Sequence, residues 1–429
     1  MDLAGQKVVV IGAAKSGQAA ARLIAAAGGQ VKLSDNRPEK EVDEGFRGWL
    51  KEKKFPTEFG EHTREFIQDS DVAVTSPGVR INAQPVIWAK EKGIQVIGEI
   101  ELAARMCPCP IIAVTGSNGK TTVSTLIHKI LQEAGRTAFL CGNVGSPFAA
   151  HVQEMKPSDF AVLEVSSFQL ETIVTFKPHV AVFLNFSQNH LDRHRDIEEY
   201  FEAKKRIFVN QDQSDFAVLN ADDARVRGLS AQLKAKVALF NTPRQRTQGK
   251  YANPNCLAAL TVTALLGIRP EAGHRVFEGF GGVEHRLEKV RTIDGVDFIN
   301  DSKATTAEAG RWALENIRQP VVMICGGRDK NIDFTVLKNL VKEKVKRMIA
   351  IGEARSKLKD AFAGVVDFEE GGSLEEAVRI ARQKAVSGDC VLLSPMCASF
   401  DMFKNFEERG KAFKEIVARL NPSHDQAVK

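Results

Sequence analysis

The feature that most constrains this chain is an apolar run followed at once by a glycine-rich loop. Residues 111–115, Ile-Ile-Ala-Val-Thr, have the composition of a buried strand, and a helical pattern continues beyond the loop. Such a loop directs backbone N–H groups and a helix N-terminus at phosphate oxygens, while its lysine neutralises charge and the following hydroxyl can bind Mg²⁺. The pattern predicts an α/β fold that binds a nucleoside triphosphate. The loop residues are Gly116, Ser117, Asn118, Gly119, Lys120, Thr121 and Thr122.

The loop departs from the usual G-x-x-x-x-G-K-[ST] pattern at one position. Val114 stands where that pattern has its first glycine. A surface turn that ends in a helix cap is therefore an alternative interpretation. The sequence Gly-Lys-Thr-Thr directly after an apolar strand favours nucleotide binding over that alternative.

The chain is too long for one hydrophobic core. Its 429 residues predict roughly two to four domains. Strand-like runs alternate with helical stretches in three blocks, and Gly281 and Gly282 indicate a flexible junction before the third. Because these runs lack period-two alternation, sheets covered by helices on both faces are expected. The runs are 7–11, 31–34, 72–75 and 95–97, then 111–115, 160–164 and 180–185, then 298–300, 321–326, 348–352 and 390–394.

Composition limits the class of ligand and the compartment. A net charge of +5 without a long basic run favours small anionic ligands over nucleic acid. No apolar run approaches the ~18 residues of a membrane span, and the first six residues do not resemble an export segment. Seven scattered cysteines suit a reducing compartment, so a cytoplasmic protein without membrane insertion is expected. Cys107 and Cys109 flank Pro108 but lack a second Cys or His pair, so zinc is not expected there.

Polar residues follow two strands of the second block. Glu164 closes the run 160–164, at the sheet edge where parallel α/β proteins bind ligands, and its carboxylate could hold Mg²⁺. A solvated strand end is the alternative. After the run 180–185, the segment that holds His190, Asp192, Arg193 and His194 concentrates potential metal ligands and phosphate contacts.

Two further features are weak when taken alone. Lys204, with two more basic residues after it, indicates a solvated basic face. Near the start, Gly12 and Gly17 imitate a dinucleotide-binding fingerprint, and Asp35 stands where a ribose-binding acid would lie. The middle glycine is replaced by Ala14, whose Cβ would obstruct a pyrophosphate, so a nicotinamide cofactor is disfavoured.

The glycine loop and the run 164–170, Glu-Val-Ser-Ser-Phe-Gln-Leu, resemble the Mur ligases, the amide-forming enzymes of peptidoglycan precursor synthesis. The run 300–305, Asn-Asp-Ser-Lys-Ala-Thr, resembles a motif of their C-terminal domain, and residues 392–410 are similar to the members that add D-glutamate. The resemblance implies three domains: a Rossmann-like UDP-substrate domain (1–98), a central P-loop ATPase domain with a parallel-rich sheet (99–283) and a Rossmann-like amino-acid domain (284–429). It also implies a monomer that joins D-glutamate to UDP-N-acetylmuramoyl-L-alanine with ATP through an acyl phosphate.

The resemblance implies a role for individual residues. The glycine loop would bind ATP, with Asn255, Arg286 and Asp301 as further contacts. Metal ligands would be Thr121, Glu164, His190 and Lys204, the last as a carbamate formed with CO₂, and Lys303 would lie near the reacting groups. The UDP-substrate would contact Lys15, Ser16, Asp35, Arg37, Ser76, Gly78, Asn143 and Ser166. D-glutamate would contact Lys330, Ser399, Phe400 and Phe406.

The chain differs from the family pattern at two places. Asn189 stands where an acidic residue usually precedes the metal-binding histidine, and Tyr251 and Ala252 replace a His-Asn pair near the adenine, although Asn255 is retained. Two alternatives therefore stay open: a ligase of the same superfamily for another amino acid or a folate, and a nucleotide-binding homologue that has lost catalysis.

Overall fold

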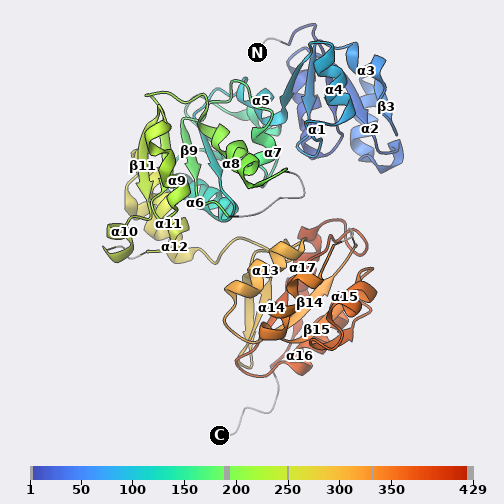
Figure 1. The fold of residues 1–429 in the computed structure, drawn as a ribbon, viewed down its shortest axis with the longest axis vertical. Helices are drawn as coiled ribbons and strands as arrows, with labels where there is room; N and C mark the ends of the chain where they lie inside the picture. Colours follow the sequence, from blue (N-terminus) through green and yellow to red (C-terminus); the bar gives the residue numbers. More distant parts are fainter. Residues whose placement is uncertain (1–2, 188–193, 249–250, 330–331, 423–429) are drawn as a thin grey trace. The chain divides into compact units, whose positions relative to one another are not determined.

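The computed structural model describes residues 3–187, 194–248, 251–329 and 332–422 (Figure 1). The chain divides into two compact units, Met1–Gly279 and Phe280–Lys429. In these described ranges the first unit holds two sheets and the second unit holds one. Each sheet carries helices between its strands, so the predicted α/β fold class is confirmed. Among the described residues, no helix combines the length and apolar character needed to cross a membrane.

The first sheet is parallel throughout and has the strand order β3-β2-β1-β4-β5. Its turn after β1 is tight: Gly12 has a φ of 96°, and a Cβ on Gly17 would lie 1.8 Å from the carbonyl oxygen of Gly12. Only glycine lets α1 start this close to the strand. The elements are β1 Lys7–Ile11, α1 Lys15–Ala26, β2 Gln30–Asp35, α2 Glu44–Glu52, β3 Thr57–Phe59, α3 Arg64–Gln68, β4 Val72–Thr75, α4 Gln84–Glu91 and β5 Gln95–Gly98.

The second sheet is also parallel, with the order β11-β10-β9-β6-β8-β7. Its first strand, β6, lies in the middle, and the chain goes first to one side of it and then to the other. Ligands bind at such a switch point in open α/β sheets. The elements are α5 Glu99–Ala104, β6 Ile111–Thr115, α6 Lys120–Glu133, β7 Ala138–Gly142, β8 Phe160–Glu164, α7 Ser167–Leu170, β9 Val180–Phe183, α8 Ile197–Lys205, β10 Phe216–Asn220, α9 Ala224–Arg227, β11 Lys236–Phe240, α10 Pro243–Gln248, α11 Pro254–Leu265 and α12 Pro270–Gly279.

Two buried acids on α5 accept hydrogen bonds from backbone N–H groups of the part of the first unit that holds the second sheet. The carboxylate of Glu101 accepts hydrogen bonds from the backbone of residues 174–176 at 2.8–2.9 Å. Glu99 accepts one from the backbone N–H of Ala149 at 2.6 Å. Burial raises the pKa of Glu99 to about 7, whereas backbone and hydroxyl donors outweigh burial and hold the pKa of Glu101 below its usual range. The two neighbouring acids therefore titrate in opposite directions from an ordinary glutamate.

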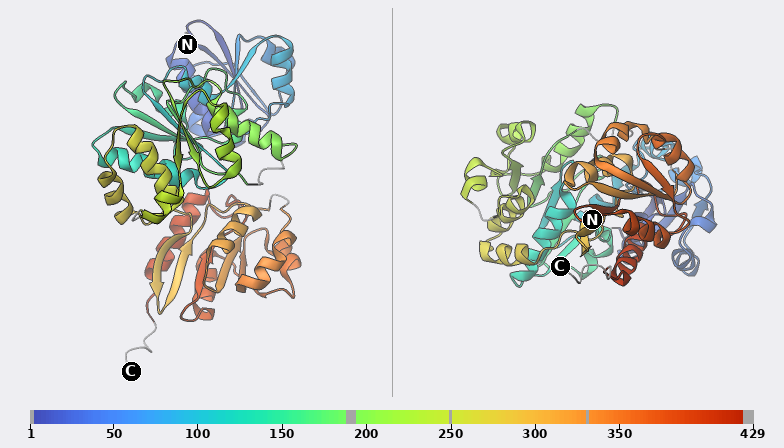
Figure 2. Two further views of the ribbon diagram at one scale, coloured as in Figure 1. Left: turned by 60° about the vertical axis from the view of Figure 1, so that its left-hand side comes forward. Right: turned by 90° about the horizontal axis from the view of Figure 1, so that it is seen from below.

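The sheet of the second unit has the order β12-β13-β17-β14-β15-β16, and only the β12–β13 pair is antiparallel. Along β14, Met323 belongs to one hydrophobic core and Val322 to another, so the strand is buried on both faces. Figure 2 shows helices on either side of this sheet. The elements are β12 Glu288–Ile293, β13 Val296–Asn300, α13 Ala307–Asn316, β14 Val321–Gly326, α14 Lys338–Lys344, β15 Val345–Ile351, α15 Arg355–Phe362, β16 Asp367–Glu370, α16 Leu374–Lys384, β17 Cys390–Leu393 and α17 Phe406–Arg419.

Candidate active site

The glycine loop, residues 116–122, leaves the central strand β6 and opens α6. Gly119 has a φ of 81°, and a Cβ there would lie 2.6 Å from Oδ1 of Asn255 on α11, so this position requires glycine. Asn185, which follows β9, fixes the loop from the other side. Its Oδ1 accepts a hydrogen bond from the backbone N–H of Asn118 at 2.9 Å, and its Nδ2 donates to the carbonyl of Asn118 at 3.1 Å. Asn185 is a positioning residue that sequence reasoning did not identify.

Lys120 is folded over this loop. Its Nζ donates to the carbonyl oxygens of Gly116 and Ser117, both at 2.9 Å. The lysine begins α6, so its ammonium group lies at the positive end of that helix, beside N–H groups that are free of helical partners. This arrangement concentrates positive charge at the loop and suits a polyphosphate.

Thr121 and Glu164 form a pair of oxygen donors beside the loop. The Thr121 hydroxyl donates to Oε2 of Glu164 at 2.6 Å, and Nδ2 of Asn143 donates to Oε1 at 2.8 Å. Strands β6 and β8 pair in parallel with Val114 opposite Glu164, so the sheet register brings the carboxylate to the loop. Both members of the pair are buried, and hydroxyl and carboxylate oxygens are ligands that Mg²⁺ prefers.

Lys204 on α8 also contacts this loop. It is 1% exposed, and its Nζ donates to the carbonyl oxygen of Gly116 at 2.9 Å while lying 4.6 Å from the centre of the Tyr200 ring. Burial and the charge of Lys120 lower the pKa of Lys204 well below its usual value, against the opposing effect of Glu164. The solvated basic face predicted from the local sequence is therefore wrong for this residue.

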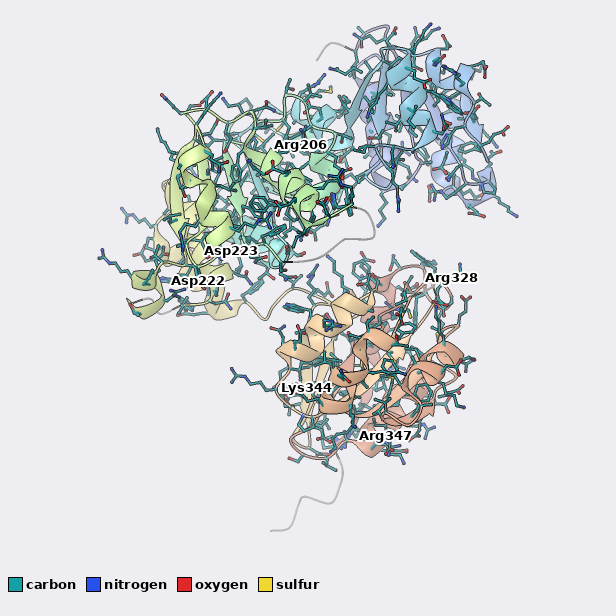
Figure 3. The ribbon with its side chains drawn as sticks, in the orientation of Figure 1. Arg206, Asp222, Asp223, Arg328, Lys344 and Arg347 are labelled. Carbon is teal, nitrogen blue, oxygen red and sulfur yellow. The ribbon has the colours of Figure 1, made fainter. Side chains whose placement is uncertain are left out.

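Two charged residues on neighbouring elements hold this part of the site in place (Figure 3). Arg206, two positions after Lys204, donates to the carbonyls of Leu170 and Ile173 at 2.7 and 2.8 Å. Asp223, after β10, caps α9 and accepts a hydrogen bond from the backbone N–H of Phe186 at 2.7 Å. The first contact fixes the end of α8, and the second fixes the chain directly after Asn185.

The segment after β9 is described only in part. His190, Asp192 and Arg193 lie outside the described residues. His194 is buried; its Nε2 lies 2.9 Å from the hydroxyl of Ser167, and its ring stacks on Phe168 at 5.4 Å. Ser166 caps α7 in a reciprocal pair with Gln169. The structure thus brings Ser166 and His194 to one short helix that follows Glu164.

In the first sheet, the predicted substrate residues gather at the carboxyl ends of β1, β2 and β4. Asp35 accepts hydrogen bonds from the backbone N–H of Ala13 at 2.5 Å and from Arg37 at 2.8–3.0 Å. Burial opposes ionisation, but these donors hold the pKa of Asp35 below its usual range. The Ser76 hydroxyl donates to the carbonyl of Gly12 at 2.8 Å. Around them, Lys15 and Gly78 are exposed and Ser16 is half-buried.

In the second unit, Asp301 follows β13 and is buried. It accepts hydrogen bonds from the backbone N–H of Leu287 at 3.2 Å and from the Ser394 hydroxyl at 3.1 Å, and burial raises its pKa to about 7. The neighbouring Arg286 has a buried Nε without a hydrogen-bond partner among the described residues. Lys303 lies with its Nζ 5.7 Å from the centre of the Phe406 ring.

The predicted amino-acid residues lie near β17 and the start of α17. Ser399 is buried, Phe400 is exposed and Phe406 is half-buried, while Lys330 lies outside the described residues. Arg409 was not assigned a role from the sequence. It is fully buried and donates to the hydroxyl and carbonyl of Ser302 and to the carbonyl of Cys397 at 2.9–3.1 Å. It therefore ties the run 300–305 to the run 392–410.

A parallel sheet with a glycine loop, a loop lysine and an acidic strand end defines the class of α/β proteins that bind nucleoside triphosphates. Within that class, the chain belongs to the Mur ligase family. Residues 6–98 match the family described as Mur ligase MurD-like, N-terminal domain. Residues 114–262 match the Mur ligase middle domain, and residues 285–397 match the Mur ligase, glutamate ligase domain.

Similar proteins extend over the whole chain. A UDP-N-acetylmuramoylalanine--D-glutamate ligase of Koribacter versatilis is 39% identical, with 98% of this chain and 99% of that protein covered. One of Pelodictyon phaeoclathratiforme is 40% identical, with 98% and 100% covered. The structure of UDP-N-acetylmuramate-alanine ligase from Thermotoga maritima has a TM-score of 0.58 and 16% identity, covering 96% of this chain and 99% of that one. The structure of a bifunctional folylpolyglutamate synthase/dihydrofolate synthase of Yersinia pestis has a TM-score of 0.54 and 17% identity. The match covers 74% of this chain and 92% of that one. At such identities the two structures show a shared fold.

Proposed function

We propose that this chain is an ATP-dependent ligase that adds D-glutamate to UDP-N-acetylmuramoyl-L-alanine in peptidoglycan precursor synthesis, with ADP and phosphate as the other products. The observation that carries the amino-acid specificity is the similarity to D-glutamate ligases, 38–40% identical over 98% of this chain. The protein acts as a cytoplasmic monomer. Its working parts are residues 1–98 for the UDP-substrate, 99–283 for ATP and 284–429 for the amino acid.

ATP is needed because the carboxylate of the substrate has no leaving group and resists attack by an amine. Transfer of the γ-phosphoryl group to a carboxylate oxygen forms an acyl phosphate. The amine of D-glutamate then attacks the carbonyl carbon, loses a proton, and phosphate departs from the tetrahedral species. During the first step, Lys120 and the backbone N–H groups of the glycine loop stabilise the charge on the transferred phosphoryl group.

The oxygen donors beside the loop fit a magnesium ion. Thr121 and Glu164 place a hydroxyl and a carboxylate oxygen 2.6 Å apart in a buried position, and Asn143 orients the second carboxylate oxygen. His190 and a carbamate on Lys204 complete the proposed ligand set. When bound, Mg²⁺ neutralises phosphate charge and orients the oxygens of ATP.

The carbamate on Lys204 is the finer part of this proposal. The ammonium group first loses a proton to solvent; the free amine then attacks CO₂ and releases a second proton, so that a carbamate anion replaces a cation. Two observations support it: the amine is buried, and it shares the carbonyl of Gly116 with a second lysine, Lys120. A negative group at this place would remove the repulsion between the two lysines and add an oxygen ligand close to Glu164.

We propose the remaining contacts from the resemblance of these positions to the family's motifs. Lys303 lies near the reacting groups; ATP is further held by Asn255, Arg286 and Asp301. The UDP-substrate is held by Lys15, Ser16, Asp35, Arg37, Ser76, Gly78, Asn143 and Ser166. D-glutamate is held by Lys330, Ser399, Phe400 and Phe406.

The decisive experiment is phosphate release from ATP with the UDP-substrate and a panel of amino acids. D-glutamate is expected to accelerate release sharply, whereas L-glutamate is not. A heavy-oxygen label in the substrate carboxylate should appear in phosphate. Acceleration by another amino acid would assign the chain to a different ligation, and nucleotide binding without any acceleration would indicate a non-catalytic homologue. Label in AMP, with pyrophosphate released, would replace acyl phosphate chemistry by adenylation.

A further inference from the structure

Three sulfur atoms converge away from the proposed active site. The Sγ atoms of Cys107 and Cys109 lie 3.5 Å apart, and each lies 3.8 Å from Sδ of Met155. The two cysteines belong to the connection between α5 and β6, and Met155 follows a 3-10 helix, Val152–Glu154. All three residues lie in the first unit. Met155 lies 46 to 48 residues from the two cysteines, so no local sequence pattern indicates it.

The triangle has the size of a metal site. With sides of 3.5, 3.8 and 3.8 Å, the point equidistant from the three sulfurs lies about 2.1 Å from each. Metal–thiolate bonds are ~2.3 Å long, so the sulfurs would need to separate by only a few tenths of an ångström. An oxidised pair would be different, because a disulfide holds its sulfurs at ~2.05 Å.

The surroundings decide which kind of ion fits. Cys109 and Met155 belong to the hydrophobic core together with Phe148 and Val152, and Cys107 packs against that core while remaining partly accessible. Thiolate and thioether ligands in an apolar setting select soft ions such as Cu(I), whereas structural zinc takes four ligands from Cys and His. Three sulfurs, one of them a thioether, match the former and not the latter.

We propose that Cys107, Cys109 and Met155 form a binding site for Cu(I). Binding forms three copper–sulfur bonds and releases two thiol protons to solvent, without a change in oxidation state. Cys107 provides the entry, because it alone of the three is partly exposed. The ion would fasten the connection that leads from α5 into β6 to the segment after Val152–Glu154, and it would stabilise the fold by mass action.

The test is an anaerobic titration of the reduced, full-length protein with Cu(I) held by a chromophoric chelator. One ion per chain is expected, with three sulfur neighbours at ~2.3 Å by X-ray absorption and a raised unfolding temperature. Cys107→Ser should abolish this binding. Met155→Leu, which keeps the volume, should weaken it at least about tenfold. Cys256→Ser, at a half-buried thiol on α11, is the matched control and should bind as the parent chain does.

Cys109 lies in the core, so Cys109→Ser could fail to fold; the partly exposed Cys107 and the conservative Met155→Leu keep the test decisive. Circular dichroism and the basal activity of both variants should match those of the parent. Equal Cu(I) affinity in Met155→Leu, or one-to-one binding that survives Cys107→Ser, would overturn the three-sulfur site. So would an absorption spectrum with oxygen or nitrogen neighbours.

Discussion

Lys204 and Lys120 donate hydrogen bonds to one and the same acceptor, the carbonyl oxygen of Gly116, each at 2.9 Å. Burial lowers the pKa of Lys204, and repulsion from the ammonium group of Lys120 lowers it further. A neutral Lys204, a negative group in its place, or the nearby carboxylate of Glu164 would each relieve this repulsion.

Replacement of Lys204 tests whether this lysine carries a carbamate. Lys204→Ala is expected to reduce kcat at least about a hundredfold, because a charged group next to the phosphates is lost. A short carboxylic acid such as formate should partly restore it, since its anion can take the place of the carbamate. Lys205→Ala is the control at the next position. Among the described contacts, the Nζ of Lys205 donates a hydrogen bond to Glu202, so this variant should keep full activity. Rescue by an added amine instead of formate would contradict the carbamate.

Lys120→Ala should abolish turnover through the loss of charge at the transferred phosphoryl group. A decrease in kcat of at least about a thousandfold is expected, with little change in unfolding temperature because Lys120 is only half-buried. Steady-state phosphate release measures the first quantity and calorimetry the second. Lys129→Ala, an exposed lysine on the same helix, is the control. Near-parental ligation by a folded Lys120→Ala protein would show that the glycine loop does not act in phosphoryl transfer.

Glu164→Gln keeps the shape of the side chain and removes its charge. The Thr121 hydroxyl can still donate to the amide oxygen, so the fold should persist. The Mg²⁺ concentration for half-maximal activity should rise by about tenfold or more, because a neutral oxygen binds the cation less well. Activity measured over a Mg²⁺ series decides this; a lower kcat with an unchanged Mg²⁺ requirement would mean that Glu164 does not hold the metal.

Glu99 should make the first unit less stable as the pH rises. Its folded pKa of about 7 exceeds the ordinary value of 4.5, so between these pH values the folded state retains a proton that the unfolded state has lost. The free energy of unfolding therefore falls as pH increases through this window, by at most about 3 kcal/mol. Glu99→Gln should flatten this slope in chemical unfolding followed between pH 4.5 and 7.

Glu101→Gln is the matched control for Glu99, since it lies on the same helix with a pKa shifted the other way. Its contribution to stability is present above the usual glutamate pKa and is lost in acid. The variant should therefore lose stability near neutral pH and leave the slope between pH 4.5 and 7 intact. A flattened slope in Glu101→Gln and an unchanged one in Glu99→Gln would show that Glu101, and not Glu99, is the acid with the raised pKa.

Buried strands and the phosphate loop were predictable from sequence, because a parallel strand covered on both faces leaves a continuous apolar run. β6, β8 and β14 have the predicted bounds. Most of the strands that were missed lie at sheet edges, namely β3, β7, β11, β12 and β16. The interior strand β10 was missed as well, although its sequence Phe-Ala-Val-Leu-Asn is an apolar run. β12 and β16 are rich in charged residues, so no local apolar pattern marks them as strands, whereas β11 does contain a short apolar run.

The candidate site was predictable only where chemistry and sequence position coincide. Thr121 and Glu164 were found because one belongs to the loop and the other ends a strand. The burial of Lys204 could not be read from a helix with polar neighbours, because the packing that covers it comes from other elements. Asn185 and Arg409 act through contacts 67 and 107 residues away, which no motif indicates.

Strand β14 separates two hydrophobic cores in the second unit. Val322 and Met323 are neighbours in sequence, yet they belong to different cores on opposite faces of β14. Met323 lies opposite Met348 of β15 in the same core. Truncations at 322 and 323 should thus have additive effects on stability, whereas truncations at 323 and 348 open one shared cavity and should not. A cavity opened on one face of the sheet should consequently leave the packing on the other face unchanged.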